Sequence, residues 1–505
     1  MTKRTMNLLL LLIFAFLIRL INLNQSLWLD EAVVAKVVRT IPFHLIPTQF
    51  SPGDFHPPLY YLFMSLWSHV FGTTEIALRM PSVIFSLIAG WYVYKIGELI
   101  KNKTVGLWSA AFFLFNPLIV YYSQEARMYM MAVMLLSIAL YYFIFTAKNV
   151  IPTKVGIQEN MDPVSPHGMT QNILLFNLFS GLAFATFYGS IYFIGTLLIS
   201  RFFINLHTKG ASLGKMGIQK YKWIPAFAGV TQMMLGLALT GALLSPLLTQ
   251  QLQTARFGLQ EVSNWNLVLG KAELKNFAMV FIKFTSGRLS WFPKWSYYIV
   301  VGTWSIVVGS LLLFNAKKNR LLTFLFAFPL IIGLLISFWV PMMQYFRFLY
   351  LIVPMSVILA GIQKNKWIPA FAGMTKGNSG MINKTVKTIV LMGFLIFSFV
   401  YLFFPQFHRE DWKGLTQNIK STQPVYMILP SSDPIAYYRT DMSLFELRDI
   451  RSLSLPETIQ VIPYVSEIYG YDYNAELTKK GCIKVDESVY RGPVILEVWR
   501  CLRNA

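Results

Sequence analysis

The chain has 505 residues, of which 55% are hydrophobic and only 13% are charged, and its formal net charge is +21. This composition excludes an ordinary soluble enzyme and predicts a polytopic membrane protein, because several apolar runs approach the length of about 20 residues that spans a bilayer. The positive charge does not indicate nucleic-acid binding, since no soluble segment carries a basic stripe with interleaved aromatic residues.

Eleven apolar runs predict eleven membrane-spanning helices. The first run is followed by Asn-Gln-Ser-Leu-Trp and not by a small-residue cleavage site, so we expect it to remain as an uncleaved anchor. It contains Arg19 near its far end, which we expect to pair with an acid outside the membrane. The spans are predicted near residues 7–23, 76–95, 105–121, 128–147, 172–188, 190–206, 227–248, 296–314, 321–340, 345–362 and 386–404.

The distribution of charge predicts the orientation of these helices. With the N-terminus inside, the inner loops hold 20 Lys and Arg residues and the outer loops nine, six of them in the long outer loop 249–295. This asymmetry is the one that the positive-inside rule describes. The first outer loop, 24–75, therefore faces the exterior, together with the candidate site residues Asp30, Glu31, His56 and Glu125.

The composition changes at about residue 405. Residues 405–505 hold 12 Lys and Arg against 13 Asp and Glu, and they contain no further spanning run. Short apolar stretches at 425–429 and 494–498 are typical of strands, and residues 434–439 favour a helix. We therefore predict a transmembrane domain over 1–404 and a small α/β domain over 405–505, which lies outside because the number of spans is odd.

Both cysteines of the chain, Cys482 and Cys501, lie in this C-terminal domain. The segments that carry them can pair as neighbouring strands. An external compartment permits a disulfide, and two free buried thiols are the alternative.

Three segments share a frame of Gly-Ile-Gln followed by Gly-x-Thr at one fixed spacing: 156–170, 217–231 and 361–375. All three fall in predicted inner loops or at their edges, separated by unlike helices, which does not fit a contiguous repeat architecture. They resemble translated mobile DNA elements, tolerated because long surface loops cost little entropy. A cytoplasmic binding motif is the alternative.

Two adjacent acids, Asp30 and Glu31, follow directly after the first span. An Asp at the centre of a membrane helix costs roughly 2.5 to 3.5 kcal/mol, and this cost fades just outside the boundary. A carboxylate at the mouth of a helical bundle can act as a base on a lipid-borne substrate in surroundings poor in water. The alternative is an ordinary solvated pair of loop acids.

Several cations are predicted at the same side of the membrane. Arg79 and Arg127 lie at the outer ends of the second and fourth spans, where a lipid phosphate would lie, and Arg347 follows a break at Pro341. Such side chains can also extend to head groups for purely structural reasons. His56 stands before a Pro-Pro pair and either shapes the loop or contacts the lipid-borne substrate.

At this point the sequence resembles a known family, the GT-C glycosyltransferases. Four short motifs carry the resemblance, and they occur in the family's order: Leu-Trp-Leu-Asp-Glu-Ala (27–32), His-Pro-Pro-Leu-Tyr-Tyr (56–61), Phe-Gly-x-x-Glu-x-x-x-Arg (71–79) and Ser-Gln-Glu-Ala-Arg-Met-Tyr (123–129). The most similar branch contains bacterial relatives of protein O-mannosyltransferases and of the lipid A aminoarabinose transferase. The resemblance covers about residues 5–415. Thr186-Phe187-Tyr188 departs from it, because many relatives carry a His before the Tyr.

The resemblance implies an α-helical GT-C fold in a bacterial inner membrane, with the active site facing the periplasm. It further implies inverting transfer of a sugar from a polyprenyl-phosphate donor to a lipid, glycan or protein acceptor. In this reading Asp30 is the base and Glu31 orients it or the acceptor. The side chains expected to bind the donor phosphate or the substrate are Arg79, Arg127, His56, Arg347 and Glu125.

No cofactor is required by this chemistry, because a lipid phosphate leaves without protonation if cations hold its charge. A divalent metal between Asp30 and Glu125, as in some relatives, is the alternative. Two other functions stay open. One is a glycan polymerase or ligase that uses a polyprenyl-diphosphate donor. The other is a transporter or flippase for lipid-linked glycans, although the predicted spans are nearly free of charge at their centres and show no two-half symmetry.

Overall fold

The protein is described from a computed structural model, which covers residues 3–148, 166–213, 223–262, 264, 269–270, 272–362 and 379–501. A helix coincides with each of the eleven predicted spans. In chain order these helices are α1 (Lys3–Arg19), α4 (Glu75–Ile100), the pair α5 (Lys103–Leu114) and α6 (Pro117–Ser123), α7 (Tyr129–Lys148), α8 (Pro166–Thr186), α9 (Ser190–Leu213), α10 (Trp223–Glu261), α13 (Lys294–Ala316), α14 (Arg320–Ile336), η6 (Tyr345–Leu351) with α15 (Ile352–Ala360), and α17 (Ser379–Phe403).

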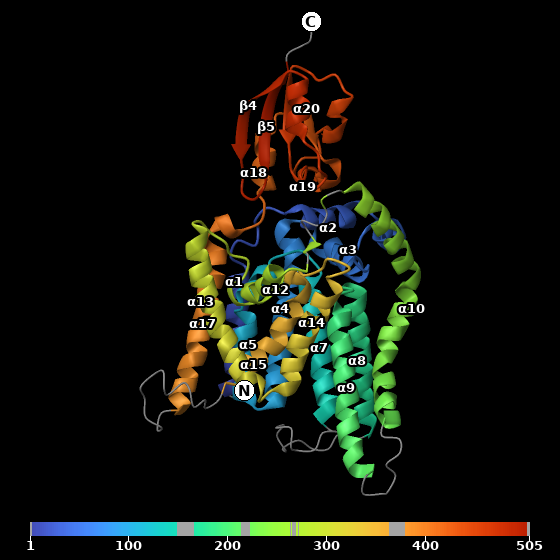
Figure 1. The fold of residues 1–505 in the computed structure, drawn as a ribbon, viewed down its shortest axis with the longest axis vertical. Coiled ribbons are helices and arrows are strands. Elements are labelled where there is room, and N and C mark those ends of the chain that lie inside the picture. Colours follow the sequence, from blue (N-terminus) through green and yellow to red (C-terminus); the bar gives the residue numbers. More distant parts are fainter. Residues whose placement is uncertain are drawn as a thin grey trace.

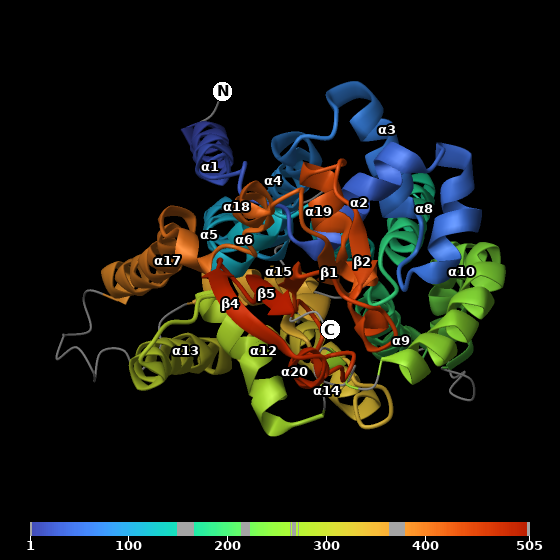
Figure 2. The same ribbon diagram turned by 90° about the horizontal axis from the view of Figure 1, so that it is seen from above.

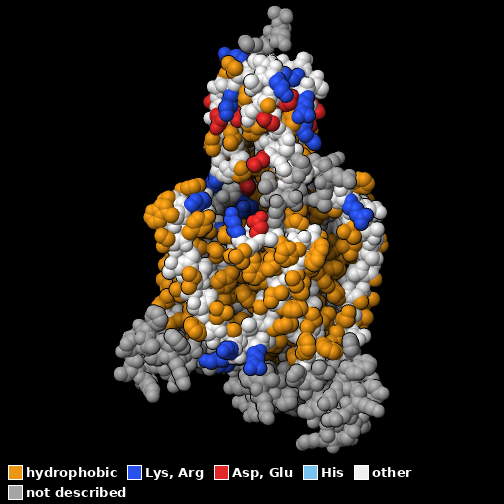
Figure 3. Space-filling view, viewed as in Figure 1, with side chains coloured by type: hydrophobic (Ala, Val, Ile, Leu, Met, Phe, Trp, Pro, Cys, Tyr) orange, Lys and Arg blue, Asp and Glu red, His pale blue; other side chains and the backbone are white. Residues whose placement is uncertain are grey.

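Five of the described helices are long and apolar enough to cross a membrane by themselves: α4, α7, α10, α13 and α17. The bent pair of α5 and α6 makes a sixth candidate, and α1, α9, α14 and η6 with α15 contain shorter apolar helices. Hydrophobic side chains cover the flank of the bundle in the view of Figure 3. The helical membrane fold is therefore as predicted, while the count of eleven spans stays a prediction.

The structure corrects the prediction of one continuous span over 105–121. The chain bends by 61° between α5 and α6, because Asn116 starts a new helix and Pro117 fits its first position. The Asn116 side chain accepts hydrogen bonds from the backbone N–H groups of Leu118 and Ile119. The break leaves the last carbonyls of α5 without partners inside their own helix.

One of these carbonyls explains the position of Arg19, whose predicted pairing with an outer acid is wrong. Its guanidinium is fully buried and donates to the carbonyls of Ala15 and Leu114, at 2.7 Å each. Arg19 thus supplies a hydrogen-bond donor to a carbonyl at the C-terminal end of α5, where the helix is broken.

Helices α4, α5, α7 and α15 pack against one another at the centre of the bundle, and α10, α13 and α17 lie at its edge (Figures 1 and 2). Glycines allow the closest of these contacts. A Cβ on Gly97 of α4 would lie 2.9 Å from the Cα of Gly106 on α5. The tight core holds the ends of α4, α6 and α7, and thereby the residues that emerge from them, at fixed positions.

Three shorter helices lie between the spans, at the end of the bundle near the C-terminal domain: α2 (Leu29–Thr40), α3 (Leu59–Phe71) and α12 (Leu274–Ser286). Asp30 and Glu31 lie in the first turn of α2, where the partial positive charge of a helix N-terminus favours carboxylates.

The last hundred residues form a five-stranded sheet at one end of the molecule (Figure 1). Its order is β2-β1-β3-β5-β4, and β2, β1 and β3 are parallel while β5 is antiparallel to both of its neighbours. The predicted strands and helix are present. The elements are α18 (Trp412–Asn418), β1 (Val425–Met427), α19 (Asp433–Tyr438), β2 (Leu444–Glu446), β3 (Thr458–Ile462), α20 (Tyr473–Lys479), β4 (Cys482–Val489) and β5 (Ile495–Cys501).

A disulfide joins Cys482 to Cys501, which are paired residues of β4 and β5. Of the two alternatives for these cysteines, a disulfide or two free thiols, the structure contains the disulfide. The three Gly-Ile-Gln segments lie largely outside the described residues, although 223–231 of the second segment form the start of α10.

The C-terminal domain is tied to the outer loop by polar contacts. Glu75 at the start of α4 accepts from Lys413 and from the Tyr438 hydroxyl, at 3.3 Å each. Lys36 of α2 pairs with Asp433 of α19 at 2.8 Å. The space between the bundle and this domain is therefore lined by residues of both.

Candidate active site

Asp30 and Glu31 are neighbours in the first turn of α2, and successive side chains of a helix point about 100° apart. Their surroundings differ accordingly. The Asp30 side chain is 35% exposed and pairs with Arg127 at 3.2 Å, whereas that of Glu31 is fully buried. Of the two predicted acids, Asp30 is the one that a substrate can reach.

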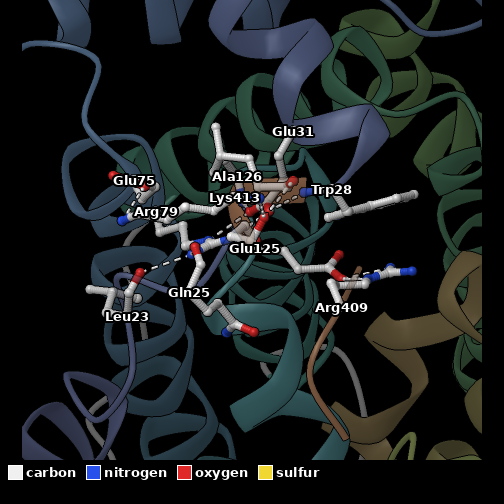
Figure 4. Close-up of polar contacts among 12 residues, drawn as sticks. Leu23, Gln25, Trp28, Glu31, Glu75, Arg79, Glu125, Ala126, Arg409 and Lys413 are labelled. Atoms are coloured by element: carbon white, nitrogen blue, oxygen red, sulfur yellow. Dashed lines mark hydrogen bonds and ion pairs between the residues drawn. The ribbon is translucent and has the colours of Figure 1, made fainter. Parts of the chain in front are cut away.

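Glu31 is held by Arg79 in a bidentate ion pair (Figure 4). Arg79 Nε donates to Oε1 at 2.8 Å and an Nη donates to Oε2 at 2.5 Å. Arg79 also donates to the carbonyls of Leu23, Gln25 and Ser26, so that its donors are engaged within the chain. Glu31 accepts in addition from the backbone N–H of Ala126 at 2.7 Å.

This geometry corrects the expectation that Arg79 binds the donor phosphate. The Arg79 side chain is 1% exposed, and a phosphate could reach it only by breaking the buried pair with Glu31. Arg79 instead positions the loop before α2, and Glu31 links that loop to the segment before α7.

Glu125 lies in the same segment and pairs with Arg409, which comes from the start of the C-terminal domain (Figure 4). One carboxylate oxygen accepts from Arg409 at 2.6 and 2.7 Å. Burial raises the pKa of Glu125 above its ordinary value, and the charge of Arg409 opposes this shift only in part. The Arg409 guanidinium also lies 3.7 Å from the centre of the Trp28 ring, a cation–π distance. Sequence reasoning assigned no role to Arg409.

His56 is placed by its own loop and by α10. Its Nδ1 lies 3.2 Å from the Asp54 carboxylate, and its carbonyl accepts from Gln251 at 3.0 Å. Burial alone would raise the pKa of Asp54, but the charges of His56 and Arg127 more than offset it and hold that pKa below its usual range. Asp54 is a site acid that sequence reasoning missed, although its position two residues before His56 could have drawn attention to it.

Tyr188, where the sequence departs from the family pattern, donates to the Gln251 side chain at 2.8 Å. It therefore supports the His56 loop indirectly, through Gln251.

Two further arginines interact with tyrosines near the site. The Arg347 side chain has one described hydrogen bond, a long contact of 3.4 Å to the Pro341 carbonyl, and it interacts electrostatically with Tyr129, as Arg127 does. Arg288 donates to the Tyr121 hydroxyl at 2.6 Å. Arg288, Tyr121 and Arg409 line a cavity of about 210 Å³ between the helices and the C-terminal domain.

The alternative to metal-free chemistry was a divalent metal between Asp30 and Glu125. In the structure these acids pair with different arginines, Arg127 and Arg409. Within the described ranges, no group of three or more His, Cys, Asp and Glu side chains is arranged to hold a metal ion. Metal dependence stays a prediction.

Comparison with known proteins bears on the family and on the fold. Residues 55–153 match the family model for dolichyl-phosphate-mannose-protein mannosyltransferase. The whole fold is similar to crystal structures of ArnT from Cupriavidus metallidurans. The apo form has a TM-score of 0.56 at 9% identity, covering 98% of this chain and 98% of that one. The form bound to undecaprenyl phosphate has a TM-score of 0.54 at 11% identity, covering 97% of each chain.

No curated protein matches the chain in sequence. At identities this low, the similarity to the solved structures shows the fold alone. The family match over residues 55–153 together with the ArnT-like fold confirms the predicted resemblance, and the family match supports the enzyme class predicted from the sequence.

The buried pair generates a prediction about stability. Arg79→Ala should destabilise the folded protein by about 3–5 kcal/mol, because it leaves the Glu31 charge buried without a partner. Lys36→Ala is the matched control, since the Lys36 side chain of the Lys36–Asp433 pair is 59% exposed and such pairs contribute about 1 kcal/mol or less. Thermal unfolding of the purified variants measures the difference. If both variants unfold at the same temperature, Arg79 has no positioning role.

Proposed function

We propose that the protein transfers a sugar from a polyprenyl-phosphate donor to an acceptor hydroxyl or amine at the outer face of the membrane, with inversion at the anomeric carbon. The observation that carries this proposal is the accessible Asp30 carboxylate beside Arg127, at the end of a helical bundle with an ArnT-like fold. The relative was crystallised with undecaprenyl phosphate, which supports the donor class. The acceptor is a lipid, a glycan or a protein.

The chemistry needs one base and a site for the leaving phosphate. The acceptor oxygen or nitrogen bonds to the anomeric carbon as its proton passes to the Asp30 carboxylate. The bond between that carbon and the phosphate oxygen breaks, and its electron pair leaves with the polyprenyl phosphate. Attack opposite the leaving group inverts the configuration. A phosphate needs no proton to leave if cations stabilise the charge that develops on it.

The arginines of the site differ in how many donors they have to offer. Arg79 is fully engaged, but Arg127 has one ion pair and a buried Nε without a hydrogen-bond partner in the described part of the chain. Among the described residues, the Arg347 side chain has a single, long hydrogen bond. We therefore assign the donor phosphate to the region between Arg127 and Arg347, where both side chains interact with Tyr129.

The remaining site residues hold this arrangement in place. Glu31 connects α2 to the segment 124–128, and Glu125 connects that segment to the C-terminal domain through Arg409. Asp54 lies near enough to Arg127 for its charge to act on the Asp54 carboxylate, and Asp54 and His56 are candidates for hydrogen bonds to sugar hydroxyls.

The first prediction of this function concerns the base. Asp30→Asn should lower transfer by about 10²–10⁴, the usual contribution of a positioned general base, because the amide keeps the shape and loses the basicity. Sugar transfer is measured with purified protein, using polyprenyl-monophosphate and polyprenyl-diphosphate sugars as alternative donors. Asp433→Asn is the control, since Asp433 pairs with Lys36 away from the site.

Activity of Asp30→Asn within about tenfold of the wild type would remove Asp30 as the base. Transfer from the diphosphate donor alone would favour a polymerase or ligase, and lipid movement across the membrane without any transfer would favour a flippase.

The second prediction concerns the phosphate. Arg127→Ala and Arg347→Ala should both raise the KM for the donor and lower kcat, and Lys at either position should recover part of the loss, because Lys keeps the charge without the forked geometry. Donor titrations of the four variants measure this, with Arg39→Ala as a control on α2. Normal donor use by both Ala variants would move the phosphate to Arg288 in the neighbouring cavity.

The third prediction concerns the orientation in the membrane. In a background without Cys482 and Cys501, a membrane-impermeant thiol reagent should label Gln49→Cys in intact cells and should not label Lys103→Cys. Both positions are exposed, so that the difference reports the side of the membrane and not burial. Labelling of Lys103→Cys alone would invert the proposed orientation and place Asp30 in the cytoplasm.

A further inference from the structure

Asp54 is a second carboxylate near Arg127 that is neither the proposed base nor part of the proposed phosphate site. The Arg127 guanidinium pairs with Asp30 at 3.2 Å, and its charge also acts on Asp54. Asp30 belongs to α2, whereas Asp54 lies between the short helix η3 (Ser51–Gly53) and α3. The two acids therefore approach the same arginine from different parts of the first outer loop.

The segment that carries Asp54 is held by a helix from a distant part of the sequence. Gln251 of α10 donates to the carbonyl of Ser51 at 2.8 Å and to that of His56 at 3.0 Å, one before and one after Asp54. The Tyr188 hydroxyl in turn donates to Gln251 at 2.8 Å. A carboxylate on a backbone fixed at both ends can distinguish ligands by their geometry.

The two oxygens of the Asp54 carboxylate differ in their contacts. Oδ1 lies 3.2 Å from His56 Nδ1. The Tyr61 hydroxyl interacts with Asp54, but Oδ2 is buried and makes no hydrogen bond within the described part of the chain. A buried acceptor without a donor is costly and calls for an explanation, of which a ligand is one. The side chain is 17% exposed, so that a ligand can reach the carboxylate with a small rotation of the side chain.

The charge of Asp54 limits the ligands that fit. Burial would raise the pKa of Asp54, but the charges of His56 and Arg127 hold this pKa below its usual range. The group is therefore a carboxylate at neutral pH, which accepts hydrogen bonds and donates none. A ligand at this position has to present a proton on oxygen or nitrogen, and a second carboxylate would be repelled.

We propose that Asp54 determines which sugar the protein uses, by accepting a hydrogen bond from a hydroxyl or ammonium group of the transferred sugar. This inference rests on the proposed function, which assigns the donor phosphate to the region between Arg127 and Arg347. The sugar is bonded directly to that phosphate. Asp54 faces the sugar and not the polyprenyl chain, because an apolar chain offers no donor to a carboxylate. The substrate class is therefore a neutral or amino sugar, and not a uronic acid.

The experiment measures lipid binding by the full-length wild type and by Asp54→Asn, which keeps the shape of the side chain and removes its charge. Asp433→Asn is the control, because Asp433 pairs with Lys36 away from the site. The ligands are undecaprenyl phosphate without a sugar and the same lipid carrying glucose, mannose, glucosamine or glucuronic acid. Thermal unfolding in detergent, followed over a titration of each lipid, gives the affinities. The affinity relative to the sugar-free lipid isolates the contribution of the sugar.

We expect the wild type and Asp433→Asn to bind at least one neutral or amino sugar lipid more tightly than the sugar-free and glucuronic acid lipids. Asp54→Asn should reduce this preference by about 10- to 100-fold, the range for a hydrogen bond to a charged group, without weakening the binding of the sugar-free lipid. A greater loss for the glucosamine lipid than for the glucose lipid would identify the ammonium group as the partner of Asp54. A greater loss for the glucose lipid would identify a hydroxyl.

Three results would contradict the inference while leaving the proposed function intact. They are an unchanged sugar preference in Asp54→Asn, an equal loss of affinity for lipids with and without sugar, and a preference of the wild type for the glucuronic acid lipid. Failure of the wild type to bind sugar-free undecaprenyl phosphate would instead refute the donor class of the proposed function, and the inference with it.

Discussion

The buried ion pair between Arg79 and Glu31 is the interaction on which the end of this protein that carries the candidate site depends. Two charges removed from water are costly unless each is fully hydrogen-bonded, and here the pair satisfies that condition through the carbonyls of the segment 23–26 and the N–H of Ala126. The pair thereby joins three parts of the chain: the exit from α1, the start of α2 and the segment that leads into α7.

Because this pair fixes the first turn of α2, it also determines where Asp30 points. A base has to be held within hydrogen-bonding reach of the acceptor, and Asp30 itself has a single ion pair, to Arg127. The buried contacts of the neighbouring Glu31 fix the helical turn that carries Asp30, so that Asp30 is held in place although it has few contacts of its own. The two adjacent acids therefore have different physical tasks: the buried one anchors the helix, and the accessible one can exchange a proton.

Much of this could be predicted from the sequence, for identifiable reasons. Apolar runs mark the helices because a bilayer demands internal hydrogen bonding over a set length, and the carboxylates at the mouth of the bundle stand out against 55% hydrophobic residues. The break between α5 and α6 was not predicted, because one apolar run covers both helices, although Asn116-Pro117 is a start signal for a new helix.

The roles of the arginines could not be predicted in this way. Arg79 and Arg127 look alike in sequence, each at a helix end, and both are buried, but Arg79 donates to three carbonyls and to Glu31 whereas Arg127 has one ion pair, to Asp30. The role of Arg409 was not predicted, because its partner Glu125 is 284 residues away in the sequence, and no local sequence pattern indicates a contact between residues so far apart.

The arginines at the site differ in what already holds their charge. Arg79, Arg127 and Arg409 each pair with a carboxylate, and Arg409 also lies over the Trp28 ring. A substrate phosphate therefore has to compete with these partners within the chain, and it competes most easily where an arginine has the fewest of them.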